Sequence, residues 1–293
     1  MFVKVAESGS FIAVAHQLQL ARSAVTRQIA ALETHLGTKL ITRSTRSLTL
    51  TAAGSAYLEK CRVILNMVDA AESSLGEEVS ALRGRIRVGL PLSFGLQELL
   101  PALLDFARRN EHIELVMDLS DHRANLIEEG LDVAVRITSD LAQGDIVRLL
   151  GRCRLLTVAS PAYLSRFGEP LHPGDLQHHE CLIYSREGVA SQWSYREGDR
   201  SLQVPVRGRL VANNGVLLTD AASRGMGLAL QPDFIVAPYL EQGKLVTVLQ
   251  DFECDPPGIY ALLPSNRYIP HRVSVFIDHL AEVLADEPAG RRS

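Results

Sequence analysis

The chain has 293 residues, of which 46% are hydrophobic and 22% charged, and its formal net charge is −4. That length suits two or three domains, and the composition excludes a disordered or fibrous protein. No apolar run is long enough to span a membrane, and the N-terminal segment lacks the apolar core of a signal peptide, so we expect no membrane partner and a cytoplasmic location. The four cysteines stand far apart without a CxxC pair, which predicts buried free thiols.

The charge is unevenly distributed along the chain. Residues 1–58 hold six Lys or Arg against two Glu, a net charge of +4, which leaves −8 for the remainder. A small basic module joined to an acidic body indicates contact with nucleic acid, and a basic surface that is only solvated is the alternative.

The first 37 residues predict two short helices joined by a tight turn. Ser10 is placed to cap a helix over 11–18, and a second helix follows after three or four residues. The apolar stripe of that second helix consists of Val25, Ile29, Leu32 and Leu36. Its other face carries Arg22, Ser23, Thr26 and Arg27. With Gly37 at the position that ends the helix, this pattern predicts a helix-turn-helix.

A hairpin and a long helix are predicted next. β-branched residues at 40–42 and 48–50 flank a polar break at 44–47, and Thr51 can cap a helix that runs to about residue 82. An apolar seam along this helix consists of Leu58, Cys61, Leu65, Val68, Leu75, Val79 and Leu82. The 3–4 spacing favours a self-paired coiled coil, and docking on the chain's own body is the alternative.

Beyond Gly84 the pattern predicts an α/β body. Strand-like runs at 85–90, 113–119 and 131–137 alternate with helical stretches at 95–109 and 122–129, which favours a parallel sheet. The second series has expected strands at 155–160, 181–184, 192–195, 202–213, 227–232 and 244–249, with helices near 161–167 and at 215–224. The strand 259–264 and a helix over 271–285 are expected to return to the first sheet.

The order of these parts resembles the LysR-type transcriptional regulators. The segment "FVKVAESGSFIAVAHQLQLARSAVTRQIAALETHLGTKLITRSTRSLTLTAAG" is similar to the family's DNA-binding signature, and "LPLSFG", "EEGLDVAVRI", "ASPAYL" and "RGMGLALQPDFIV" extend the resemblance through the body. One departure is Ala21, where the family commonly has a Ser that caps the recognition helix.

The resemblance implies a multidomain protein with no enzyme activity and no cofactor. Its expected parts are a winged helix-turn-helix over 1–55, a linker and dimerisation helix over 56–83, and a two-lobed α/β effector domain over 84–293 that resembles type 2 periplasmic binding proteins. Lobe I is expected at 84–157 and 261–293, and lobe II at 158–260. The implied partners are double-stranded operator DNA, a small-molecule effector and further copies of the chain, as a homodimer or a homotetramer.

A helix-turn-helix lays its second helix in the major groove, which assigns a role to each polar residue of that helix. We expect Arg22, Ser23 and Thr26 to read base edges and Arg27 to contact phosphate. The hairpin tip would present Arg43, Thr45 and Arg46 to the adjacent minor groove.

A cleft between two α/β lobes is the expected place for a small ligand. Ser93 and Phe94 lie where a strand gives way to a helix near Gly95, and a helix start with a hydroxyl favours a carboxylate effector. The alternative is that Ser93 only caps this helix. The opposite wall is expected to hold Arg136, Asn213, Asn214, Gln231 and Pro232. Arg136 is equally suited to pairing with Glu128 or Asp132.

Other functions have less support in the sequence. His178, His179 and Cys181 are too few for a metal site, and no nucleophile elbow or paired carboxylates indicate catalysis. A rival hypothesis is a solute-binding protein, or a degenerate enzyme of that kind, in which residues 1–82 serve only as an oligomerisation arm. A third is a regulator that works without a ligand.

Overall fold

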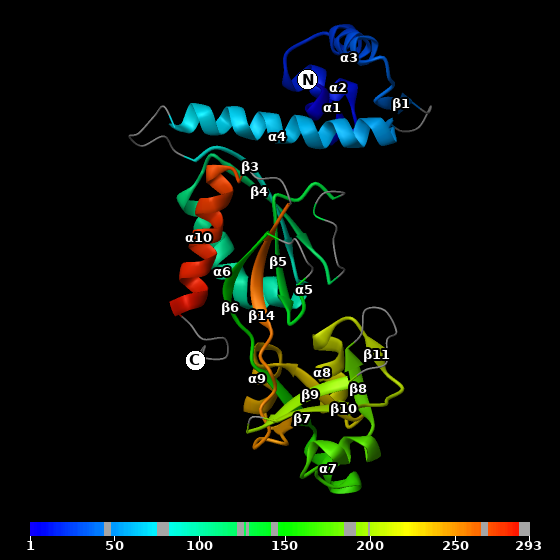
Figure 1. Cartoon of the computed structure of the whole chain (residues 1–293), viewed down its shortest axis with the longest axis vertical. Helices are drawn as coiled ribbons and strands as arrows, with labels where there is room; N and C mark the ends of the chain where they lie inside the picture. Colours follow the sequence, from blue (N-terminus) through cyan, green and yellow to red (C-terminus); the bar gives the residue numbers. More distant parts are fainter. Residues whose placement is uncertain are drawn as a thin grey trace. The chain divides into compact units, whose positions relative to one another are not determined.

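The computed structural model describes residues 1–43, 48–74, 82–121, 126, 129–141, 146–184, 192–198, 200–264 and 269–286. The chain divides near residue 80 into two compact units, and each is described by itself. Figure 1 labels their helices and strands and colours them from blue at the N-terminus to red at the C-terminus.

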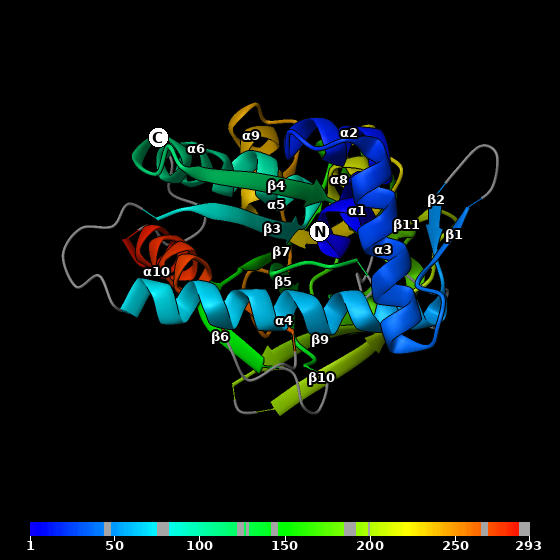
Figure 2. The same ribbon diagram turned by 90° about the horizontal axis from the view of Figure 1, so that it is seen from above.

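The first unit is a winged helix-turn-helix followed by a long helix. Its elements are α1 (Phe2–Ser8), α2 (Phe11–Gln17), α3 (Arg22–Leu36), β1 (Ile41–Arg43), β2 (Leu48–Leu50) and α4 (Ala52–Ser74). Their common core contains Phe2, Val5, Val14, Ala15, Val25, Ile29, Leu40, Ile41 and Leu58. Figure 2 shows the antiparallel β1–β2 hairpin beside α3.

Three sequence signals for helix ends are confirmed in this unit. The Ser10 hydroxyl accepts the Ala13 N–H at 3.2 Å, and the Thr51 hydroxyl accepts the Gly54 N–H at 2.9 Å, so each caps the helix that follows. Gly37 ends α3 with a φ of 65°, a left-handed conformation in which glycine has no Cβ to clash.

The apolar stripe of α3 differs from the prediction, and the predicted end of α4 falls outside the described residues. The stripe of α3 is buried at Val25 and Ile29, but Leu32 is half-buried and Leu36 is 36% exposed, because Glu33 turns inward at that end of the helix. The predicted continuation of α4 to residue 82, with Leu75 and Val79 of the seam, falls on residues 75–81, which lie outside the described residues.

The first lobe of the second unit is built on a mixed sheet of order β4-β3-β5-β14-β6. Its strands are β3 (Gly84–Leu90), β4 (Ile113–Leu119), β5 (Val133–Thr138), β6 (Ile146–Arg152) and β14 (Gly258–Leu263). Its helices are α5 (Leu92–Phe94), the π-helical turn η1 (Gly95–Leu99), α6 (Leu100–Arg109) and α10 (His271–Asp286). In the stretch predicted as a helix at 122–129, the described residues Leu126 and Glu129 lie in turns.

The expected parallel pairing is confirmed for β4, β3 and β5, whereas β14, for which no direction was predicted, runs antiparallel to both of its neighbours. Strand β6 leads towards the second sheet and β14 returns from it, so these two neighbours run in opposite directions. The return of β14 to the first sheet was predicted, whereas β6 was not.

The second lobe contains a five-stranded sheet of order β11-β8-β12-β7-β13 and a separate β9–β10 hairpin. Its strands are β7 (Leu155–Ala159), β8 (Cys181–Tyr184), β9 (Gln192–Glu197), β10 (Arg200–Pro205), β11 (Val211–Ala212), β12 (Leu228–Pro232) and β13 (Val246–Thr247). Its helices are α7 (Pro161–Phe167), the 3-10 turn η2 (Pro173–His178), α8 (Gly215–Ser223) and α9 (Asp233–Glu241).

Several second-lobe predictions were wrong in detail. The run 202–213 forms two strands in different sheets, and the run 244–249 contributes only the two residues of β13. Helix α9 was not predicted, because its sequence is apolar on most sides and holds Pro238 in its interior. Strand β7 starts at Leu155 and β14 at Gly258, so both chain crossings come earlier than the expected boundaries at 157/158 and 260/261.

The two lobes pack on one another through α9. Phe234 and Ile235 of this helix belong to the same buried cluster as Phe94 and Leu99 of the first lobe. This contact places the end of β12 and the start of α9 next to α5 and η1 of the first lobe. Among the described residues, no helix is long and apolar enough to cross a membrane.

Candidate DNA-binding face and effector site

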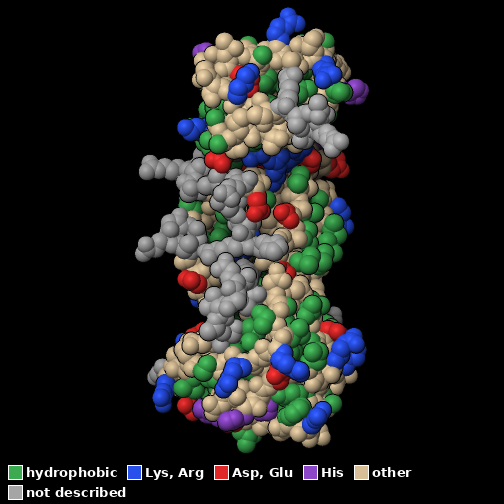
Figure 3. Space-filling view, turned by 90° about the vertical axis from the view of Figure 1, so that its right-hand side faces the viewer, with side chains coloured by type: hydrophobic (Ala, Val, Ile, Leu, Met, Phe, Trp, Pro, Cys, Tyr) green, Lys and Arg blue, Asp and Glu red, His purple; other side chains and the backbone are tan. Residues whose placement is uncertain are grey.

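The outer face of α3 presents the residues expected to contact DNA. Arg22, Ser23 and Arg27 are exposed and Thr26 is half-buried, while Val25 between them is fully buried. Separate Lys and Arg side chains project from the viewed face of this unit (Figure 3). Arg43 ends β1, whereas Thr45 and Arg46 of the hairpin tip lie outside the described residues.

The start of α3 has no side-chain cap. Ala21 occupies the N-cap position in an extended conformation, with φ −66° and ψ 141°, and contributes no side-chain hydrogen bond. The first N–H groups of a helix without a cap point outward with a partial positive charge, which suits a phosphate oxygen.

Glu33 is a structural residue that the sequence analysis missed. Its side chain is buried, one carboxylate oxygen accepts the N–H groups of Leu40 and Ile41 at 3.0 and 3.1 Å, and the other accepts Lys39 Nζ at 2.6 Å. Burial by itself would raise the pKa of this carboxyl, but the hydrogen bonds from Lys39, Ile41 and Leu40 outweigh it and the pKa is lowered. Glu33 therefore fixes the wing against the recognition helix.

In the second unit, the predicted effector residues Ser93 and Phe94 differ in their exposure. Ser93 is half-buried in α5, next to Leu92 at the start of the helix. Phe94, also in α5, is 1% exposed, and its ring packs against Phe234 with centroids 5.3 Å apart. The Phe94 side chain thus belongs to the core.

Asp121 joins the two lobes at this point. Its Oδ1 accepts the Leu92 N–H at 3.0 Å, and its Oδ2 accepts Asn214 Nδ2 at 3.0 Å. Asn214 also caps α8, since its Oδ1 accepts the Leu217 N–H at 3.1 Å. The sequence analysis named Asn214 but not Asp121, which follows strand β4 in the same position relative to the sheet as Leu92 follows β3.

The remaining second-lobe candidates surround the start of α8. Asn213 is half-buried, and Pro232 is half-buried at the end of β12. Gln231 is 1% exposed, and its Nε2 is a buried polar atom without a hydrogen-bond partner within the described part of the chain. Its amide lies against Gly215, where an added Cβ would come within 2.5 Å of Gln231 Oε1.

Arg136 lies on β5 of the first lobe's sheet, next to β3, the strand that leads into α5. It is 8% exposed on β5, pairs in register with Tyr260 of β14, and donates from Nη1 to the Val135 carbonyl at 3.3 Å. Asp132, one of its suggested partners, accepts the Arg87 N–H at 2.8 Å, and Glu128 lies outside the described residues.

These parts match a known family over nearly the whole chain. Residues 1–55 match the bacterial regulatory helix-turn-helix protein of the lysR family, and residues 80–285 match the LysR substrate binding domain. The chain belongs to the LysR-type transcriptional regulators. The predicted resemblance and fold class are thereby confirmed. Members of this family are transcriptional regulators that bind DNA and small-molecule effectors, and they are not enzymes.

Individual LysR-type relatives are similar along their full length. An HTH-type transcriptional regulator of Xanthomonas campestris pv. campestris is 35% identical over 288 residues, which cover 97% of this chain and 84% of that one. The structure of CrgA from Neisseria meningitidis is 32% identical with a TM-score of 0.61, covering 97% of this chain and 96% of CrgA. That of AphB, a Vibrio cholerae virulence activator, is 29% identical with a TM-score of 0.59 and covers 96% of each chain.

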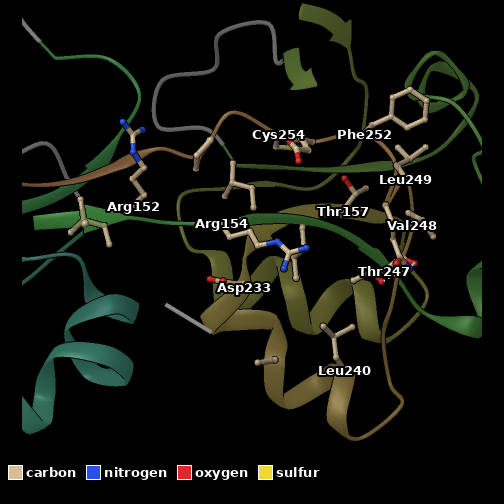
Figure 4. Close-up of a pocket in the computed structure, with 18 of the residues that line it drawn as sticks. Arg152, Arg154, Thr157, Asp233, Leu240, Thr247, Val248, Leu249, Phe252 and Cys254 are labelled. Carbon is tan, nitrogen blue, oxygen red and sulfur yellow. Dashed lines mark hydrogen bonds between the residues drawn. The ribbon is translucent and has the colours of Figure 1, made fainter. Parts of the chain in front are cut away.

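The second unit of this LysR-type regulator also holds a cavity of about 1180 Å³. Its lining includes Arg154 of the chain crossing, Asp233 of α9 and apolar side chains such as Leu249, and Figure 4 shows how these residues lie. Burial raises the pKa of the Asp233 carboxyl to about 6, although Arg154 nearby opposes the shift.

The cysteines of this LysR-type chain and His179 lie in surroundings that give no indication of catalysis or metal binding. None of the four cysteines forms a disulfide, and burial raises the pKa of Cys153, Cys181 and Cys254 to about 12, which makes them poor nucleophiles. His179 makes a 3.2 Å hydrogen bond with the Tyr163 hydroxyl. Within the described ranges, no three His, Cys, Asp or Glu side chains are placed to hold a metal ion.

Proposed function

We propose that this regulator binds a specific operator sequence through α3 and the β1–β2 wing as a homodimer, and that an acidic effector between the two lobes changes its DNA binding. The observation that supports DNA contact best is the exposed polar face of α3. Arg22, Ser23 and Arg27 point outward there, opposite the buried Val25 and Ile29. The proposed function implies a cytoplasmic location, because bacterial DNA lies in the cytoplasm.

The chemistry of this face suggests two kinds of contact. Arginine can donate two parallel hydrogen bonds to guanine, and serine or threonine hydroxyls give shorter and less selective bonds, so Arg22, Ser23 and Thr26 suit base reading. Arg27 lies one turn further along the helix and suits a phosphate oxygen. Arg43, Thr45 and Arg46 of the wing are proposed to enter or flank the minor groove.

The Arg27→Ala variant tests this assignment. Each phosphate contact adds close to one unit to the slope of log affinity against log salt, so the variant should flatten that slope by about 1 and weaken operator and unrelated duplexes alike. Fluorescence anisotropy over a salt series measures both effects. Arg108→Ala removes an exposed arginine of the second unit and serves as the control. An unchanged slope for Arg27→Ala would remove it from the phosphate contacts.

Helix α4 supports the proposed dimer. Its apolar side chains Ile64, Leu65, Met67 and Val68 are 59%, 49%, 54% and 46% exposed in the single chain. Contiguous exposed apolar side chains on a helix favour pairing with a second helix, and two identical helices give a symmetric dimer. Two such dimers would make the expected homotetramer.

The proposed effector site is the cluster where the lobes meet. Ser93 and the start of the first lobe's helix form one side, and Asn213, Asn214, Gln231 and Pro232 form the other, whereas Phe94 can contribute only its main chain. The side-chain hydroxyl and amides of this set can donate hydrogen bonds, and a helix start favours negative charge, which suits a carboxylate ligand. A thermal-shift panel of aromatic and aliphatic carboxylates tests it, since a ligand that binds only the folded state raises the melting temperature. No response to any acid would favour a regulator that works without a ligand.

A further inference from the structure

The Asp121 carboxylate accepts one hydrogen bond from each lobe. The Leu92 N–H comes from the helix start of the first lobe, and the Asn214 side-chain amide comes from the N-cap of α8 in the second. Both distances are 3.0 Å, and the Asn214 bond is partly buried. A carboxylate of the chain itself therefore already binds the two donors that an acidic ligand between the lobes would use.

One further donor beside this junction lacks an acceptor. Gln231 Nε2 is buried without a partner beside Gly215, the residue that follows Asn214. Burying an amide without a hydrogen-bond partner is unfavourable, so its neighbourhood favours a ligand that brings an acceptor oxygen. The cluster thus contains one internal carboxylate and at least one unsatisfied donor.

We propose that Asp121 occupies the position of the effector carboxylate in the ligand-free protein, and that an acidic effector binds by displacing it. This inference rests on the proposed effector site and names the residue that regulates it. Asp121 holds the two lobes together without a ligand, and it raises the effector concentration needed for binding. An effector carboxylate replaces its two hydrogen bonds, and the rest of the molecule can supply an acceptor to Gln231.

Removal of the Asp121 side chain should create a binding site for a small carboxylate. The probe is acetate, and the measurement is the melting temperature of the full chain in sodium acetate against sodium chloride at equal pH and ionic strength. Acetate should stabilise Asp121→Ala saturably, with a half-saturating concentration at least about fivefold lower than for the wild type.

The control for charge is Asp118→Ala, which removes a carboxylate that is exposed on the same strand, β4. This variant should respond to acetate like the wild type. The proposal is overturned if Asp121→Ala is no more sensitive to acetate than Asp118→Ala, because Asp121 would then not be excluding a carboxylate.

If Asp121→Ala does not fold, exchanging the side chains of residues 121 and 214 tests the hydrogen bond between them, which we call the Asp121–Asn214 bridge. Asn214→Asp alone places two carboxylates together and should lower the melting temperature. In the double variant Asp121→Asn/Asn214→Asp, an amide can again donate to a carboxylate while position 214 keeps an oxygen for the Leu217 N–H. The double variant should recover most of the lost melting temperature. If the melting temperature of the double variant falls by the sum of the losses of the two single variants, the Asp121–Asn214 bridge does not form and the proposal is overturned.

The outcomes separate this inference from the proposed function. Acetate rescue of Asp121→Ala without any salt-dependent DNA binding by the wild type would reject the proposed operator binding and support the Asp121 site. Salt-dependent DNA binding without acetate rescue would reject the Asp121 inference and leave operator binding supported.

Discussion

At the scale of single residues, Glu33 has the clearest energetic role in the DNA-binding unit. Its buried carboxylate accepts two main-chain N–H groups of the segment that leads into the wing. The Lys39 ammonium that also contacts it is largely exposed, so this ion pair contributes little compared with the two main-chain hydrogen bonds. The backbone of Leu40 is held on its other side by Thr51, whose N–H donates to the Leu40 carbonyl at 3.0 Å.

Glu33→Ala should destabilise the first unit by about 1–3 kcal/mol at neutral pH, because it removes the oxygen that accepts both main-chain N–H groups and leaves these groups without an acceptor. The pKa of Glu33 is lowered in the folded chain, so its stabilisation is present above the ordinary glutamate pKa of about 4.3 and is lost as the pH falls through the lowered value. Urea unfolding of wild type and variant across this pH range measures the difference.

Lys39→Ala is the matched control for this prediction. It removes only the exposed partner of Glu33 and should cost less than about 1 kcal/mol. A cost for Lys39→Ala equal to that of Glu33→Ala would contradict the view that the main-chain hydrogen bonds dominate.

At the scale of elements, α3 combines a well-formed C-terminus with an uncapped start. Gly37 ends the helix in the left-handed conformation, whereas Ala21 offers no acceptor to the first-turn amides. The backbone of Ala21 is already extended, which is the conformation that a capping serine adopts. The geometry for a cap is therefore present without the hydroxyl.

Ala21→Ser should stabilise the first unit by about 1 kcal/mol, because its hydroxyl can accept an N–H of the first turn. Chemical denaturation with a near-neutral control, Ala21→Val, measures the gain, since valine lacks a side-chain acceptor and is as poor an N-cap residue as alanine. A serine variant no more stable than the valine variant would show that these amides gain nothing from a cap.

Helices and strands were predicted correctly where local sequence signals are strong, and they were missed where long-range packing stabilises the element. Caps at Ser10 and Thr51 and the terminator Gly37 act within a few residues, and the helices that they bound were predicted. The helix α9 contains Pro238, and its burial against the first lobe's core, not its pattern, stabilises it. Strand β6 is half exposed along its length, and its pairing partner β14 lies more than a hundred residues away in the chain.

At the scale of the whole molecule, the exposed stripe of α4 predicts how the chain assembles. Ile64→Asp places a charge among exposed apolar side chains that would pair in a dimer. The variant should shift the chain towards monomers and weaken binding to an operator with two half-sites more than binding to one half-site. Sedimentation over a concentration series and DNA titration measure these effects.

Ser55→Glu is the control for this prediction. It also introduces an acidic residue into α4, but at an exposed position outside the stripe. If Ile64→Asp assembles and binds paired half-sites as Ser55→Glu does, α4 is not the dimer contact.

The sequence by itself determined the family, the order of the domains and the polar face of α3, because these depend on residue spacing along a single helix or on an extended motif. It also named Ser93, Asn214 and Gln231 near the lobe junction from their positions at strand and helix ends. Only the tertiary structure decided that Phe94 is a core residue, that Glu33 fixes the wing and that Asp121 reaches Asn214 across 93 residues of chain. Such contacts depend on how strands from distant segments align, and no local periodicity encodes that alignment.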